Sequence, residues 1–179
     1  MALGRAIIRL GLSILAFASL APAQAQAVRS LIELRQHQVV IQQWDTSCGA
    51  AALATVLTYT MQDPVSETAV AQAMLRKTDS LRVKVRGGFS LLDMKRFLES
   101  RGYAAEGYRG LSLEELLALR SPIVPIEEYS GPHFVVVRGL RDGWIDIADP
   151  AFGNRRMTVE QFGEVWRQGI GFAVTRARF

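Results

Sequence analysis

The chain has 179 residues, of which 21 are basic and 17 are acidic, and it contains one cysteine and two histidines. Its formal net charge of +4 falls to +2 once residues 1–25 are set aside, because that segment holds two arginines and no acidic residue. This near balance argues against a nucleic-acid partner, and one cysteine with two dispersed histidines gives no cluster of metal ligands. We therefore expect no nucleic-acid partner, no metal and no cofactor.

Residues 1–25 have the pattern of a secretory signal peptide. Two arginines precede an almost wholly apolar stretch at 10–20, and the small residues after it offer cleavage sites behind Ala25 or Ala27. An uncleaved membrane anchor is the alternative, which is disfavoured because the apolar run is shorter than the roughly 20 residues needed to span a bilayer. We expect a periplasmic or secreted protein with no integral membrane segment after signal cleavage, in which residues 26–179 form a single domain.

The next part of the chain has helical patterns. Small and apolar residues over 49–59 cover most of a helix surface, which predicts a central helix packed on more than one side. Ser66 can cap a second helix, whereas Ser90 and Ser112 each precede an acidic residue by three positions, as in a capping box. The basic stretch at 76–86 is predicted to be a solvated loop.

Strand patterns follow, at 122–126, 133–140, 144–147 and 170–175. A turn at 141–143 joins the second and third of these into an antiparallel hairpin. Thr158 and Gln161 have capping-box spacing, which predicts a helix over 159–166. Helices followed by strands indicate an α+β domain rather than a doubly wound sheet.

Cys48 stands at the beginning of the predicted central helix. A thiol attacks as its thiolate, and the amide hydrogens and dipole at a helix amino terminus stabilise that anion. A lone cysteine in an exported chain cannot form an intramolecular disulfide, so it needs another reason to be there. Cys48 is therefore the candidate nucleophile, and its activation requires an imidazole partner.

His133 is the better of the two candidate bases, because it begins a predicted strand, whereas His37 lies in a polar stretch and is predicted to be on the surface. An imidazole base needs an acceptor for its second nitrogen. The hairpin can bring Asp149 beside His133, while the rival Asp146 is predicted to face away from its apolar neighbours. A core histidine and a turn-forming Asp149 before Pro150 are the alternatives.

Acyl transfer also requires donors for the developing oxyanion. Gln42, six residues before Cys48, can supply a side-chain amide beside the Cys48 backbone amide, with Gln43 as its competitor. Trp44 and Phe152 are candidates for lining the cleft, although packing is an equally good role for each.

Three motifs occur in order, namely Gln42-x5-Cys48-Gly49-Ala50-Ala51-x-Leu53, His133-Phe134-Val135-Val136-Val137 and Asp149-Pro150-Ala151-x-Gly153. Together they resemble the bacteriocin-processing, double-glycine-leader family of papain-like cysteine peptidases, numbered thirty-nine among the cysteine peptidase families. The resemblance covers essentially the whole mature chain. It implies a papain-like fold with a nucleophile helix packed on an antiparallel sheet, a triad of Cys48, His133 and Asp149, and Gln42 in the oxyanion hole.

Two features depart from the family pattern. Many members are amino-terminal domains of membrane ABC exporters that cleave leaders after Gly-Gly, whereas this sequence has no P-loop, and Ser47 stands where the family often has Asp. Stand-alone exported relatives look like periplasmic peptidases associated with secretion or functional-amyloid systems. The resemblance thus implies an exported endopeptidase with a peptide or protein substrate and a secretion-system component as a further partner. A catalytically silent peptide-binding module and another acyl-transfer enzyme, such as an amidase or transglutaminase, are the alternatives.

Overall fold

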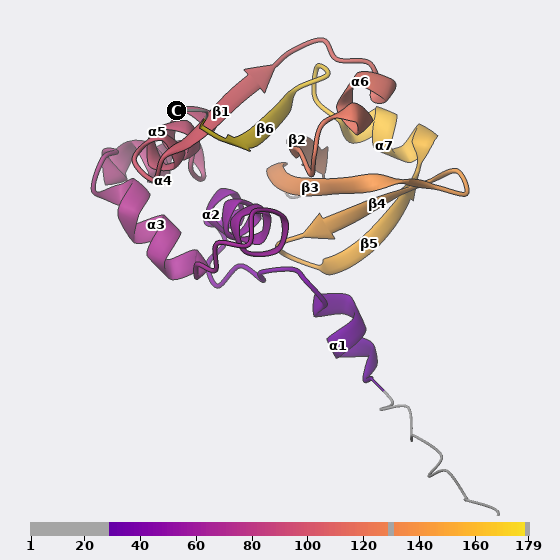
Figure 1. Cartoon of the computed structure of the whole chain (residues 1–179), viewed down its shortest axis with the longest axis horizontal. Helices are drawn as coiled ribbons and strands as arrows, with labels where there is room; N and C mark the ends of the chain where they lie inside the picture. Colours follow the sequence, from indigo (N-terminus) through magenta and orange to yellow (C-terminus); the bar gives the residue numbers. More distant parts are fainter. Residues whose placement is uncertain (1–28, 129–130, 178–179) are drawn as a thin grey trace, which may run out of the picture.

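The computed structural model of the chain describes residues 29–128 and 131–177, so the predicted signal peptide lies outside it (Figure 1). The helical elements are α1 (Leu31–Gln36), α2 (Cys48–Thr55), the π-helical turn η1 (Val56–Thr60), α3 (Glu67–Leu75), α4 (Ser80–Arg86), α5 (Leu91–Glu99), α6 (Leu113–Ala118) and α7 (Val159–Val165). The strands are β1 (Tyr103–Tyr108), β2 (Ile123–Glu128), β3 (Gly131–Arg141), β4 (Trp144–Asp149), β5 (Gly153–Thr158) and β6 (Gly171–Arg176). Within these two ranges no helix combines the length and apolarity needed to cross a membrane.

The strands form one antiparallel sheet in the order β1-β6-β2-β3-β4-β5. Near the start of β3, His133 is paired with Ile126 of β2. The pairing of Val136 with Ala148 brings the end of β4, where Asp149 stands, towards the start of β3. This is the antiparallel hairpin that the sequence predicts, and the α+β class is confirmed.

Successive residues of β3 face two different hydrophobic cores. Val136 belongs to the core shared with α2, α3 and α5, whereas Val135 and Val137 belong to the core covered by Leu116 of α6 and Phe162 of α7. Figure 1 shows α2 to α5 grouped together, with α6 and α7 beyond β2 and β3. A strand buried on both faces reads as a continuous β-branched run, which is why the sequence marks it clearly.

Helix α2 is the central helix of the fold, and all eight of its residues are buried. Its last residue, Thr55, donates its hydroxyl to the carbonyl of Ala51 at 2.8 Å and accepts a hydrogen bond from the Val40 amide at 3.0 Å. The chain then continues as η1 rather than as regular α-helix, so the predicted helix over 49–59 changes its hydrogen-bonding pattern halfway. Packing on several sides, as predicted, holds the first residue of α2 in a fixed place.

The predicted capping boxes at Ser90, Ser112 and Thr158 are all formed, and Ser66 caps α3. The basic side chains of 76–86 are exposed, as predicted, but the prediction of a loop is wrong for residues 80–86.

Residues 80–86 form α4, which begins where the Asp79 carboxylate accepts a hydrogen bond from the Leu81 amide and ends at Gly87 with a left-handed φ of 79°. Arg86 also forms a 2.7 Å ion pair with the buried carboxylate of Asp93. A cap, a terminating glycine and this ion pair stabilise a helix that the charge pattern alone conceals.

Candidate active site

Cys48 is the first residue of α2, and its side chain is almost buried, with 6% of its surface exposed. The preceding Ser47 does not cap the helix: its hydroxyl donates to the Trp44 carbonyl at 2.7 Å and accepts from the Trp44 amide at 3.2 Å. This hydroxyl therefore closes the turn before Cys48. The first amides of α2 are left free of a side-chain cap and point to where an anion would be stabilised.

His133 and Asp149 are in direct contact, with Nε2 of the imidazole 2.8 Å from Oδ1 of the carboxylate. The same oxygen accepts hydrogen bonds from the backbone amides of Ala151 at 2.8 Å and Phe152 at 3.2 Å. Asp149 is completely buried. It both closes the turn after β4 and contacts the imidazole, so the two roles that the sequence leaves open coexist.

Cys48 and His133 perturb each other in opposite directions. Burial raises the pKa of the Cys48 thiol, but hydrogen bonds from the His133 side chain and the Phe134 backbone amide outweigh it and bring the pKa below its ordinary value. Burial lowers the pKa of His133, but hydrogen bonds with Asp149 and Cys48 raise it to about 9. Because Nε2 faces Asp149, Nδ1 is the nitrogen available to Cys48. Both shifts favour the pair of a thiolate and an imidazolium over the neutral pair of a thiol and an imidazole.

Gln42 lies in the loop that precedes Cys48. Its side-chain nitrogen donates to the Trp44 carbonyl at 3.1 Å, and its side-chain oxygen is buried and accepts no hydrogen bond from the described part of the chain. A carboxamide nitrogen carries two hydrogens, so one donor remains. Gln43 is exposed, and its backbone amide is bound to Glu67 at 3.1 Å. Of the two glutamines, Gln42 has the more enclosed side chain.

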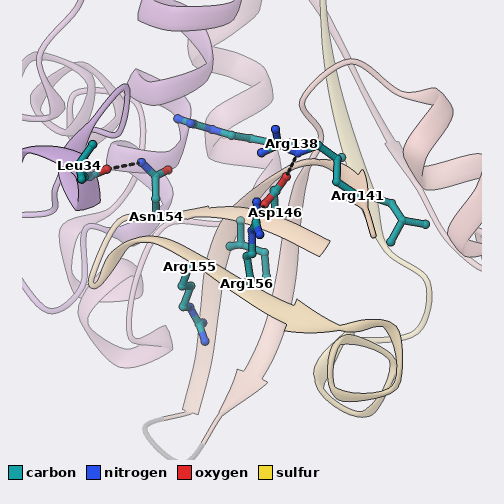
Figure 2. A pocket seen from close by; sticks show the side chains of 10 residues that line it. Leu34, Arg138, Arg141, Asp146, Asn154, Arg155 and Arg156 are labelled. Carbon is teal, nitrogen blue, oxygen red and sulfur yellow. Dashed lines mark hydrogen bonds and ion pairs between the residues drawn. The ribbon is translucent and has the colours of Figure 1, made fainter. Parts of the chain in front are cut away.

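The rival carboxylate, Asp146, is occupied elsewhere. Figure 2 shows it between Arg141 and Arg156, whose Nε atoms lie 2.6 Å and 2.7 Å from its two oxygens. These residues line a basin of about 850 Å³ between α1 and strands β3 to β5, and neither Cys48 nor His133 contributes to it. Asp146 therefore lies apart from the cysteine and histidine, as its alternation with Ile145 and Ile147 predicts.

The two aromatic residues proposed for the cleft are exposed, Trp44 by 49% and Phe152 by 58%. Trp44 and Ser47 border a pocket of about 410 Å³ that extends to Phe89 and to residues of α3 and α4. Trp44 thus lines a hollow beside the start of α2, whereas the Phe152 ring lies 5.7 Å from the guanidinium of Arg155. His37 is exposed, as predicted.

The sequence profile of the Peptidase C39 family matches residues 36–177, which include every element that carries the site. The chain belongs to this family. Its curated relatives include two proteins named probable functional amyloid protease FapD, from Pseudomonas aeruginosa and Pseudomonas fluorescens. They are 42% and 43% identical to it over 148 residues. The matched region is 82% of this chain and 64% of each relative, so the chain spans less than two thirds of their length.

Solved structures place the fold in the same C39 group. A double glycine motif protease from an AMS/PCAT transporter, crystallised with a leader peptide, is 27% identical, with a TM-score of 0.63 over 78% of this chain and 91% of that one. This similarity confirms the papain-like arrangement of a central helix against an antiparallel sheet.

Two charged residues of this C39 peptidase domain were not singled out by any sequence motif. Arg155 of β5 contacts the Asp149 carboxylate, and Glu128 at the end of β2 contacts Arg155. Only the pairing of β4 with β5 brings Arg155 close to Asp149, so no spacing along the chain signalled it. Within the described ranges, no three His, Cys, Asp or Glu side chains form a group that could hold a metal ion.

Proposed function

We propose that the chain is an exported cysteine endopeptidase whose peptidase domain comprises residues 26–179. The observation that supports this most directly is the contact of 2.8 Å between His133 and Asp149, together with the opposed pKa shifts of Cys48 and His133. These are the properties of a nucleophile paired with an oriented imidazole.

In the proposed reaction, the Cys48 thiolate attacks the carbonyl carbon of the substrate peptide bond. The Cys48 backbone amide and the second side-chain N–H of Gln42 stabilise the tetrahedral oxyanion. The His133 imidazolium donates its Nδ1 proton to the leaving amine, which departs as the carbon–nitrogen bond breaks and leaves a thioester. Neutral His133 then removes a proton from water, which attacks the thioester and releases the carboxyl product and the thiolate. Asp149 holds the imidazole by Nε2 throughout.

The proposed substrate is a secreted or periplasmic peptide or protein associated with a functional-amyloid or secretion system. The names of the Pseudomonas relatives support the amyloid association. The leader-peptide complex of the double glycine motif protease supports cleavage at Gly-Gly-like sites. Release of the signal peptide after Ala25 or Ala27 would place the enzyme outside the cytoplasm, which amino-terminal sequencing of the exported protein tests directly.

Replacement of Cys48 by alanine tests the peptidase. Exported proteins from cells that carry the parent or the Cys48→Ala chain are compared by mass spectrometry of their new amino termini, with His37→Ala as a matched surface control. We expect termini that depend on Cys48 and not on His37. Unchanged processing in Cys48→Ala would contradict catalysis and favour a peptide-binding module. Products that are deamidated or cross-linked instead of cleaved would indicate an amidase or a transglutaminase.

A further inference from the structure

Arg155 contacts the carboxylate oxygen of Asp149 that His133 does not contact. Its Nε donates a hydrogen bond of 2.7 Å to Oδ2 of Asp149, and its Nη2 lies 2.7 Å from the same oxygen. On its other side, Nη1 lies 2.8 Å from Oε1 of Glu128. Arg155 also borders the basin around Asp146, but Figure 2 shows its side chain pointing away from Arg141 and Arg156.

The two oxygens of Asp149 therefore have separate partners. Oδ1 accepts from His133 and from the Ala151 and Phe152 amides, while Oδ2 is bound by Arg155. With both oxygens bound, the carboxylate cannot rotate without losing a charge-assisted hydrogen bond.

We propose that Arg155 is a positioning residue of the active site, which fixes the Asp149 carboxylate so that Oδ1 remains directed at His133. This inference rests on the proposed function of Cys48, His133 and Asp149, and it adds a residue that does not touch the reacting atoms.

The order of charged groups in the site explains why a permanent cation is needed beside Asp149. From the end of β2 to the start of α2, the contacts run through Glu128, Arg155, Asp149, His133 and Cys48, so the charges alternate in sign when the thiolate has formed. Asp149 is completely buried, and a buried carboxylate retains its charge only with nearby cations and donors. Arg155 supplies a permanent cation, whereas His133 is a cation only while it is protonated.

Arg155 is itself held in place from two further directions. Glu128 is the last residue of β2, and β2 pairs with β3 at His133. The ion pair with Glu128 therefore links Arg155 to the strand that lies next to His133. The Phe152 ring lies 5.7 Å from the guanidinium. Only 23% of the Arg155 side chain is exposed, so solvent screens these contacts less than those of a surface ion pair. A guanidinium held from several sides can keep its carboxylate partner in one orientation.

The test uses the full chain and the rate at which iodoacetamide alkylates Cys48 as a function of pH, a readout that requires no substrate. In Arg155→Gln the pH of half-maximal alkylation should rise by about one unit, and the rate at pH 7 should fall about tenfold. Arg155→Lys retains the charge but cannot bridge Asp149 and Glu128, so its alkylation rate should lie between those of the parent and Arg155→Gln. Arg156→Gln is the matched control, because Arg156 pairs with Asp146 and should leave the profile unchanged.

The outcomes separate positioning from stability. A lower melting temperature in Arg155→Gln with an unchanged alkylation profile would overturn the proposal and leave Arg155 a purely structural role. If Arg155→Gln does not fold, Arg155→Lys decides, because the parental rate in that variant would contradict the need for a guanidinium. A shifted profile in a chain that cleaves no peptide would support the positioning role and refute the proposed peptidase. If Cys48 in the parent is alkylated with the pH profile of a free cysteine, both the positioning role of Arg155 and the proposed peptidase are contradicted.

Discussion

The backbone amide of Gln42 donates a hydrogen bond of 2.9 Å to the carbonyl of Pro150. This bond joins the loop before Cys48 to the turn after Asp149, two segments that are far apart in the sequence. The proposed oxyanion donor and the residue that contacts His133 are consequently held in a fixed relation to each other. A mutation in the loop before Cys48 or in the turn after Asp149 should therefore affect the positions of both Gln42 and Asp149.

Gln42→Ala should lower kcat about 100- to 1000-fold with little change in KM, because an oxyanion donor acts mainly in the transition state. Gln43→Ala is the control, since Gln43 is exposed and contributes to the adjacent loop through its backbone amide. Steady-state kinetics on a cleaved peptide measure both variants. Equal losses in the two variants would show that the loop, and not the Gln42 amide, is what matters.

Asp149→Asn should lower kcat/KM at least about tenfold and move the basic limb of the pH–rate profile to lower pH. Asparagine can still accept a hydrogen bond from His133, but it lacks the charge that helps to raise the His133 pKa to about 9. Asp146→Asn should leave the profile unchanged, because its partners are Arg141 and Arg156. A larger effect of Asp146→Asn would mean that the wrong carboxylate has been assigned to the site.

The pH dependence of stability should differ between the parent and Cys48→Ala. The raised pKa of His133 contributes stability that is complete below its ordinary value of 6.5 and is lost as pH rises towards about 9. The lowered pKa of Cys48 acts oppositely, because its contribution grows as pH rises towards the thiol's ordinary value. The two contributions therefore oppose each other in the parent as pH rises above 6.5.

Removal of the thiol leaves the part of the His133 contribution that Asp149 supplies and removes the opposing contribution of Cys48. Cys48→Ala should therefore lose more stability than the parent as pH rises from 6.5. Urea unfolding at several pH values measures this difference. Parallel curves for the two proteins would be evidence against an ion pair between Cys48 and His133.

Gly49→Ala should destabilise the fold by about 1 kcal/mol, because the end of the Met94 side chain must shift within a packed core and this cost exceeds the helical gain of alanine over glycine. A Cβ at this position would lie 2.5 Å from Cε of the fully buried Met94. Gly163→Ala in α7 is the matched control, because a Cβ there meets no atom within 4 Å and should stabilise the helix by up to about 1 kcal/mol. Urea midpoints compare the two. Gly49→Ala at parental stability would show that Met94 moves aside at little cost.

Local signals predicted much of the fold. The capping boxes at Ser90, Ser112 and Thr158 depend on residues three positions apart, and β3 is a β-branched run because both of its faces are buried. The strands at 103–108 and 153–158 were not predicted, because their sequences contain glycines and arginines and lack a regular apolar alternation. They are edge strands, and pairing with β6 and β4 stabilises them.

For the site, the sequence by itself determined the chemistry available: one thiol at a helix start, a histidine at a strand start and an aspartate at the end of the same hairpin. Order and spacing along the chain are sufficient for those three, because each lies in or beside an element with a strong local pattern. The tertiary structure places Asp149 against His133 and Asp146 between two arginines, as the sequence predicts, but only the tertiary structure brought Arg155 and Glu128 to the buried carboxylate. Those contacts depend on strand register and on which face a side chain occupies, and a shift of one residue would reverse both.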